Sequence, residues 1–466
     1  MNIKKGIAYV LLANLINLSV NLFSGFVLPK YLSIETYANI RLFQLYTSYI
    51  GITHLGFADG MYLRNGGKKL KEINKYEIKT EFKTFCIFQF FITIIAIILS
   101  LVVRNEMLLF CSMVIIPINI SNYLRNLYNA IGEFKNSSKY TNINTIFIFV
   151  INIFLLLIIK SDYYYSYIIG QIIVYFLYCI YILIETRKIF GNTKHCKFNK
   201  NYFIEDIKSG FLLLIGNFSN IFFTTIDRIF VRNSIGLTQF AFYSFATSIE
   251  GLLNVFITPI STVMYNYFCN TNDINLILNV KRKILIFSSL LIALIFPAKF
   301  IIEHWITKYN DAINVLFFLV SSQYISIMIR TVHINLYKAQ KKQNRYFKIM
   351  ILIVILSILL NTLGLLVSKS IVVISIATLI TNIIWYIIGE IEHKKYKLEI
   401  KDYVYTFTLM IAFLICGNLL NSEIGFFIYL VILSTSILLF EKKQFFELLR
   451  IVFTLVKTKY LLYKNN

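Results

Sequence analysis

Long apolar stretches recur along almost the whole chain, separated by short polar or charged segments. Several run for about 20 residues, for example 85–103 and 349–367, which is the length that a helix needs to cross a hydrocarbon core about 30 Å thick. The core of a soluble protein rarely contains more than one such stretch. The pattern therefore predicts an all-α polytopic membrane protein.

Turns and charge clusters divide this pattern into about fourteen predicted transmembrane helices. The first ends at Pro29 and Lys30 without a small-residue cleavage site, which favours a retained span over a signal peptide. The predicted spans are 6–29, 36–61, 84–103, 107–130, 142–159, 163–185, 209–232, 237–268, 284–302, 312–337, 349–367, 370–389, 403–420 and 424–440.

Composition agrees with lipid as the surrounding solvent. Hydrophobic residues make up 58% of the chain and charged residues 15%. A soluble protein has about 45–50% and about 25%.

The distribution of basic residues predicts the orientation of the spans. With the N-terminus in the cytoplasm, the predicted inner loops hold 36 of the 46 Lys and Arg residues, and the outer loops hold 7. Because Lys and Arg stay preferentially on the cytoplasmic side, both termini are predicted to be cytoplasmic, with the protein in the inner membrane. The net charge of +23 then lies on flanks that face anionic lipid, and it does not indicate a nucleic-acid partner.

Residues 441–466 form a basic tail. Lys443, Arg450, Lys457 and Lys464 are spaced seven residues apart, with apolar residues on another face. This spacing is typical of an amphipathic helix on the inner leaflet, and a partly disordered basic end is the alternative.

The six cysteines are scattered without paired spacing. No disulfide framework is therefore expected. No His, Cys and Asp cluster has the spacing of metal ligands, so neither a metal nor a cofactor is expected.

Four predicted spans carry polar residues at intervals of three and four, which places each set on one helical face. Shifts of 203 and 204 residues match the sets between the two halves of the chain, so spans 1–6 and 7–12 are predicted to be copies. A competing match of 127–130 with 336–339 requires a shift of 209 and leaves the register open. The sets are Asn14, Asn17, Asn21 and Ser24; Asn119, Asn122, Asn126 and Asn129; Asn217, Asn220, Thr224 and Asp227; and Gln323, Ser326, Arg330 and His333.

The repeat predicts two six-helix lobes, residues 1–190 and 206–391, followed by two further helices in 402–440. An even number of spans per repeat gives both lobes one orientation, so a pseudo-two-fold axis should run along the membrane normal. The polar faces would then line a central water-filled cavity, because amides that face lipid lack partners. The alternative is hydrogen bonding of Asn and Ser between packed helices.

Charged residues inside the spans suggest an anionic cargo. They are Arg41, Arg228, Glu250 and Arg330, with Arg125 near an inner end. A charge in mid-span costs about 2.5–3.5 kcal/mol, so such residues usually face a cavity or one another. Guanidinium groups bind phosphates through two parallel hydrogen bonds, which favours a phosphate-bearing cargo.

Some of these charges have simpler explanations. Arg228 can pair with Asp227 or with a neighbouring span, and Arg125 can extend its side chain to the inner surface. Glu250 and Asp227 are candidates for coupling transport to protons or cations, although Glu250 can instead neutralise an arginine. Arg41 and Arg330 are therefore the stronger candidates for cargo binding.

Two parts of the chain, 14–67 and 210–267, resemble bacterial O-antigen and capsule repeat-unit flippases. These flippases belong to the multidrug, oligosaccharidyl-lipid and polysaccharide exporter superfamily. The stretches that carry the resemblance are Leu28-Pro-Lys-Tyr-Leu-Ser-Ile-Glu-Thr-Tyr-Ala38, Gly56-Phe-Ala-Asp-Gly-Met-Tyr-Leu-Arg-Asn-Gly-Gly-Lys68, Thr225-Ile-Asp-Arg228, Tyr243-Ser-Phe-Ala246 and Pro259-Ile-Ser261.

The resemblance implies a two-lobed transporter and not an enzyme. Its cargo would be an undecaprenyl-pyrophosphate-linked oligosaccharide, turned from the inner to the outer leaflet by alternating access. Membrane lipids are expected partners, and a polysaccharide polymerase and chain-length proteins are further candidates. The Asp227-Arg228 pair matches the family pattern. The residues expected to bind cargo are Arg41, Arg330, Arg228, Asp227, Arg125, Asn119, Asn122, Asn126, Asn217 and Asn220.

Two other functions remain open. A multidrug or toxin exporter of the same superfamily would take organic cations, which a cavity with more Arg than acid disfavours. A membrane polysaccharide polymerase or acyltransferase would need a catalytic loop on the outer side, where every predicted loop is short.

Overall fold

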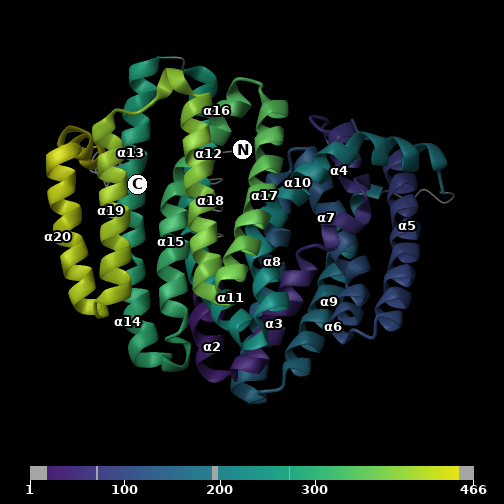
Figure 1. Ribbon diagram of the computed structural model, residues 1–466. Helices are drawn as coiled ribbons and strands as arrows, with labels where there is room; N and C mark the ends of the chain where they lie inside the picture. Colours follow the sequence, from purple (N-terminus) through teal and green to yellow (C-terminus); the bar gives the residue numbers. More distant parts are fainter. Residues whose placement is uncertain (1–17, 70–71, 191–197, 272, 451–466) are drawn as a thin grey trace, which may run out of the picture. The chain divides into compact units, whose positions relative to one another are not determined.

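The computed structural model describes residues 18–69, 72–190, 198–271 and 273–450. Every regular element in these ranges is helical, which confirms the predicted all-α fold (Figure 1). The chain divides into two compact units, Met1–Ile226 and Asp227–Asn466, and the division falls inside α10 (Lys200–Ser234). The lobes expected at 1–190 and 206–391, and the axis that relates them, stay a prediction.

Unit 1 holds the helices that precede the division and the first part of α10. Three short turns interrupt them: the π-helical η1 (Phe23–Val27) and η3 (Phe154–Ile158), and the 3₁₀ turn η2 (Ile50–His54). The α-helices are α2 (Leu28–Tyr31), α3 (Ile34–Thr47), α4 (Phe57–Asn65), α5 (Lys75–Val102), α6 (Glu106–Met113), α7 (Ile115–Ala130), α8 (Phe134–Ile153) and α9 (Tyr164–Phe190).

Helix α7 is the centre of unit 1, because it packs against α4, α5, α8 and α9. Phe57, Phe85 and Tyr123 are fully buried where α4, α5 and α7 meet. The ring centroids of Phe85 and Tyr123 lie 4.8 Å apart in a stacked arrangement. Stacked aromatic rings add to the energy of apolar burial, so this cluster fixes the position of α4.

Unit 2 holds the remaining helices. Its short turns are η4 (Thr307–Tyr309), η5 (Ile329–His333) and η6 (Lys394–Tyr396), of which η5 is π-helical. The α-helices are α11 (Leu237–Leu252), α12 (Asn254–Asn270), α13 (Ile274–Ala293), α14 (Ile295–Trp305), α15 (Ala312–Met328), α16 (Ile334–Ala339), α17 (Gln343–Val367), α18 (Ile371–Glu392), α19 (Ile400–Leu419) and α20 (Ser422–Phe440).

Helix α15 is the core of unit 2 and packs against α11, α13, α18 and α19 (Figure 1). In the most apolar window of the span Ala312–Ala339, 83% of the residues are buried, against 28% in Gln343–Val367. The exposed residues of the outer helices are nevertheless large and apolar, such as Val367 at 84% and Leu439 at 78%. Apolar surface on the outside and close packing inside are what a lipid solvent selects.

The described part of the chain has 10 helices that are long and apolar enough to cross a membrane, or 12 if each of two bent pairs is one span. The protein is therefore an integral membrane protein, while the count of fourteen stays a prediction. The bent pairs are α6 with α7, at 41°, and α11 with α12, at 49°. Pro117 cannot donate to the carbonyl of Met113, the last residue of α6, which accounts for the first break.

The span expected at 36–61 is broken and not one continuous helix. Helix α3 ends at Thr47, and α4 begins only at Phe57. Between them Leu55 (φ 50°) and Gly56 (φ 90°) adopt left-handed conformations, which end a right-handed helix.

The two ends of the chain are described only in part. Most of the expected first span at 6–29 lies outside the described residues. In the basic tail, residues 442–450 are helical. Glu447 accepts a hydrogen bond from Asn279 at 3.1 Å and pairs with Lys283 at 2.9 Å. Residues 451–466 lie outside the described ranges.

Candidate functional site

Arg41 lies on α3 with all three guanidinium nitrogens engaged. Nε donates to Tyr37 Oη at 2.9 Å, Nη1 to Gln44 Oε1 at 2.9 Å and Nη2 to Ser24 O at 3.0 Å. The guanidinium also lies 4.9 Å from the centroid of the Tyr37 ring. Arg41 therefore links α3 to η1, and an anion could bind it only by displacing one of these acceptors.

Arg330 has a different environment. It lies in the π-helical turn η5, a feature that is frequent at functional sites. Its Nη2 donates to Asn254 Oδ1 at 2.7 Å, while its buried Nε has no hydrogen-bond partner among the described residues. Gln323 donates to the same Asn254 oxygen at 3.1 Å. Arg330 thus keeps donor capacity for a ligand.

The break between α11 and α12 positions this group. Asn254 is the first residue of α12, directly after the bend. Farther along α12, Ser261 donates from Oγ to the carbonyl oxygen of Arg330 at 3.0 Å. Asn335 donates to Ser261 O at 2.8 Å. These bonds occupy the backbone carbonyl that a π-turn leaves free and hold η5 against α12.

Helix α7 uses its polar stripe partly for contacts between helices. Asn119 is fully buried and donates to Thr53 Oγ1 and to Gln89 Oε1, both at 2.7 Å. Arg125 donates to Asn122 Oδ1 at 2.9 Å on the same helix. Arg125, Asn122 and Asn126 are only partly buried, so they remain accessible to a polar ligand.

Two more stripe residues lie on α10. Asn217 and Asn220 are exposed, and Asn217 donates weakly to Asp59 Oδ1 at 3.4 Å. Asn14 and Asn17, which should match them in the first half, lie outside the described residues. The repeat of the stripe therefore stays a prediction.

Asp227 is a hub of unit 2. Its carboxylate accepts hydrogen bonds from Tyr243 Oη at 3.2 Å, Asn361 Nδ2 at 3.0 Å and Thr378 Oγ1 at 2.6 Å. The side chain thus joins α10 to α11, α17 and α18. Arg228 is its electrostatic partner, which agrees with the ion-pair alternative.

Glu250 lies near the inner face of this group. Arg330 and Arg228 act on it electrostatically, and so does Asp227. Within unit 2 the structure therefore brings together four of the expected residues, which are Asp227, Arg228, Glu250 and Arg330. Arg41, Arg125 and the amides of α7 belong to unit 1.

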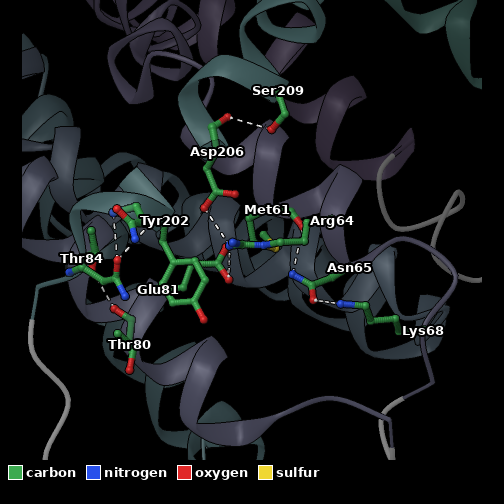
Figure 2. A network of polar contacts seen from close by, with 12 residues as sticks. Met61, Arg64, Asn65, Lys68, Thr80, Glu81, Thr84, Tyr202, Asp206 and Ser209 are labelled. Atoms are coloured by element: carbon green, nitrogen blue, oxygen red, sulfur yellow. Dashed lines mark hydrogen bonds and ion pairs between the residues drawn. The ribbon is translucent and has the colours of Figure 1, made fainter. Parts of the chain in front are cut away.

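Sequence reasoning missed a charged cluster on α4, α5 and α10. Figure 2 shows Arg64 between Glu81 and Asp206. Arg64 Nη2 lies 2.7 Å from Glu81 Oε2 and 2.9 Å from Asp206 Oδ2, and the guanidinium covers the ring of Tyr202 at 4.6 Å. The side chains of Glu81 and Asp206 are 3% and 2% exposed. A sequence signal existed, because both acids stand in otherwise basic segments.

Glycines bring α4 and α10 into backbone contact beside this cluster. A Cβ at Gly60 would lie 2.1 Å from Asp206 O, and a Cβ at Gly210 would lie 2.0 Å from Gly56 O. Small residues allow helices to approach closely in membranes. The approach places Asp206 within reach of Arg64.

A second missed cluster surrounds Glu390 in unit 2. Lys281, fully buried, donates to Glu390 Oε1 at 2.6 Å, and His333 Nε2 lies 2.8 Å from the same atom. Tyr403 donates to Oε2 at 2.8 Å. Burial, with the nearby His333 and Lys281 charges, lowers the pKa of His393, just past α18, to about 4. His333, expected on a cavity face, instead belongs to this buried network.

Metal chemistry finds no support in the described part of the chain, where no group of three or more His, Cys, Asp or Glu side chains could hold an ion. The geometry offers fixed guanidinium and amide donors in two units. Such donors recognise anionic and polar ligands.

Comparison with solved structures shows the fold. The chain is similar to a structure described as "Lipid II flippase MurJ, inward closed conformation", with a TM-score of 0.73, 17% identity, and 95% of this chain and 100% of that chain covered. It is also similar to an inward-facing multidrug resistance MATE family transporter of the MOP superfamily, with a TM-score of 0.51, 12% identity, and 86% and 95% covered. A mutant of the Vibrio cholerae MATE transporter VcmN gives 0.52, 10%, and 83% and 94%.

Comparison with known sequences shows the family. No curated protein matches the chain. Residues 3–272, more than half of the chain, match the model of a family described as "Polysaccharide biosynthesis protein". The family and the fold are those of membrane transporters and flippases and not of catalytic enzymes. The chain belongs to the polysaccharide biosynthesis protein family and has the fold of the MurJ and MATE transporters of the MOP superfamily.

Proposed function

We propose that this chain is a flippase that turns undecaprenyl-pyrophosphate-linked oligosaccharide repeat units from the inner to the outer leaflet, for O-antigen, capsule or a related surface polysaccharide. Family membership supports a role in polysaccharide synthesis. The shared fold with a protein described as a lipid II flippase supports a lipid-linked cargo. The prenyl tail would stay in lipid, so only the pyrophosphate and the sugars need a polar route.

The observation that carries the proposal is the bonding state of Arg330. An arginine in mid-span costs about 2.5–3.5 kcal/mol to insert, and one neutral amide offsets little of this. Its Nη2 bonds Asn254, and its buried Nε lacks a partner among the described residues. A pyrophosphate that accepts two parallel hydrogen bonds would supply both the missing charge and the missing acceptor.

The other expected residues receive supporting roles in the same proposal. Arg41 would bind the pyrophosphate at a second stage of transfer, after releasing one of its three acceptors. Arg125 and the stripe amides, from Asn119 to Asn220, would contact the cargo along the polar route. Asp227 and Glu250 would couple transfer to a proton or a cation, because both are carboxylates beside arginines of the site.

The orientation of the spans belongs to the proposal too. Both termini would lie in the cytoplasm, with the protein in the inner membrane, and lobes 1–190 and 206–391 would rock about the cargo to give alternating access. Reporter fusions after Asn310 and after Asn466 should report the outside and the inside respectively. An outside C-terminus would contradict the orientation and leave the Arg330 argument standing.

The function is tested by complementation of surface polysaccharide in a deletion strain, with protein level checked by immunoblot. Arg330→Ala should abolish polysaccharide and leave lipid-linked repeat units on the inner leaflet. Arg330→Lys should retain part of the activity, because it keeps the charge and loses the planar fork. Arg187→Ala, which removes an exposed arginine of α9, is the matched control and should complement fully.

The same strain separates the rival function. Its observation is the shared MATE fold, at a TM-score of 0.51. A drug or toxin exporter would change susceptibility to organic cations and leave polysaccharide intact. Normal polysaccharide from Arg330→Ala at normal protein level would remove Arg330 from the site.

A further inference from the structure

A cavity of about 390 Å³ lies in unit 1 where the segment after α4 meets the turn between α7 and α8. Residues 66–69 line one side of it, and residues 129–132 with Phe134 line the other. None of the residues expected to bind cargo lines this cavity. It is therefore separate from the polar route proposed above.

Two glycine turns shape the cavity. Gly67 (φ 82°) and Gly132 (φ 74°) adopt left-handed conformations that residues with a Cβ rarely adopt. The N–H of Gly67 donates to the carbonyl oxygen of Ala130 at 3.0 Å, which ties the two segments together. The backbone itself thus builds the cavity.

The lining combines positive charge with apolar surface. Lys68 and Lys69 are both exposed, and Lys68 Nζ lies 3.3 Å from Asn65 Oδ1. Leu63 and Phe134, also in the lining, are 52% and 64% exposed. Ammonium groups beside exposed large apolar side chains fit the boundary between lipid headgroups and acyl chains.

We propose that this cavity binds the phosphate headgroup of an anionic phospholipid. Basic pockets between transmembrane helices on the cytoplasmic side bind such headgroups. Lys68 and Lys69 hold the phosphate, while Leu63 and Phe134 contact the glycerol and the upper acyl chains. This site uses the inner orientation of the loop after α4, but it uses no step of the proposed transport.

The available donors favour a phospholipid over the pyrophosphate of a cargo. Arg64 is the guanidinium nearest along α4, and Figure 2 shows its side chain directed toward Glu81 and Asp206, with Lys68 on the opposite side. Both carboxylates engage its Nη2. The cavity therefore offers two point charges and no planar fork, which suits a single phosphodiester.

Native mass spectrometry of the full-length protein tests the site, with dioleoyl phosphatidylglycerol and dioleoyl phosphatidylcholine as probes. The wild type should retain the anionic lipid preferentially. The double variant Lys68→Gln, Lys69→Gln should lose about tenfold of that preference, because each lysine contributes on the order of 1 kcal/mol at a membrane surface. Lys394→Gln with Lys395→Gln removes two exposed lysines from another predicted inner loop and is the matched control, with no expected change.

Two further measurements fix the identity of the ligand. Phe134→Ala should weaken retention of both lipids by about threefold and leave their ratio unchanged, because it removes apolar contact and no charge. An unchanged preference for phosphatidylglycerol in the double lysine variant would overturn the proposal. It would also be overturned if that variant lost undecaprenyl pyrophosphate and kept phosphatidylglycerol, since the cavity would then serve the cargo. None of these readouts depends on transport.

Discussion

Arg64 in unit 1 and Arg330 in unit 2 are both shielded from solvent, yet their surroundings differ. Arg64 contacts two carboxylates, at 2.7 and 2.9 Å. Arg330 has one neutral amide partner, and its Nε has none among the described residues. A cation with excess countercharge helps to hold its helices together, because removing it leaves buried acids unpaired. A cation with spare donors contributes less to folding and suits a ligand that brings its own negative charge.

Arg41 stands between these two cases. Its three donors are all used, but by neutral acceptors on its own helix and on η1. The three arginines therefore form a series in which the stability contribution should fall as the bonding to the protein becomes weaker. That order can be measured with variants of the purified protein in detergent.

The largest effect is expected for Arg64→Ala. It leaves Glu81 and Asp206 buried side by side without a countercharge, which should cost about 3–5 kcal/mol and lower the thermal midpoint by roughly 10 °C. Arg64→Lys should recover part of the loss. Lys68→Ala, one turn along the chain and outside the cluster, is the control and should change the midpoint by less than about 2 °C. Equal midpoints for Arg64→Ala and this control would show that the cluster does not stabilise the fold.

The close approach of α4 and α10 gives the next prediction. Gly60→Ala places a Cβ 2.1 Å from Asp206 O, so the helices must separate, at a cost of about 2–3 kcal/mol. The cost should shrink in the Arg64→Ala background, because both changes weaken one contact. Gly216→Ala on α10, where nothing lies within 4 Å of the added Cβ, should instead stabilise slightly. Additive effects of the first two variants would separate the glycine contact from the ion pairs.

Arg41→Ala should have an intermediate effect of about 1–2 kcal/mol. It removes three hydrogen bonds whose acceptors can in part turn to water, since the side chain is only partly buried. Gln44→Ala, which removes one acceptor, should cost less. Thermal unfolding of both variants provides the measurement, and a loss as large as that of Arg64→Ala would break the proposed order.

Hydropathy was enough to predict most spans, because a stretch of apolar residues has few alternatives to a membrane helix. It failed at 36–61, where Gly56 meets the backbone of α10 through a contact distant in sequence. Arg64 looked like one more inner-loop charge, since Asp206 lies 142 residues away. Amides at intervals of three and four likewise predicted a polar face. The same spacing serves a cavity or a helix contact, and Asn119 makes the latter.

The smallest stability effect and the clearest functional one should belong to Arg330→Ala. The variant gives up one bond to Asn254 and releases a shielded charge, so the two changes offset each other to within about 1 kcal/mol. Inorganic pyrophosphate in excess should raise the midpoint of the wild type by linkage, since it binds the folded state, and should not raise that of Arg330→Ala. Asn254→Ala, which leaves the guanidinium with still more spare donors, should keep the response to pyrophosphate. If Arg330→Ala were as unstable as Arg64→Ala, Arg330 would have a structural role like that of Arg64, and the distinction between the two arginines would fail.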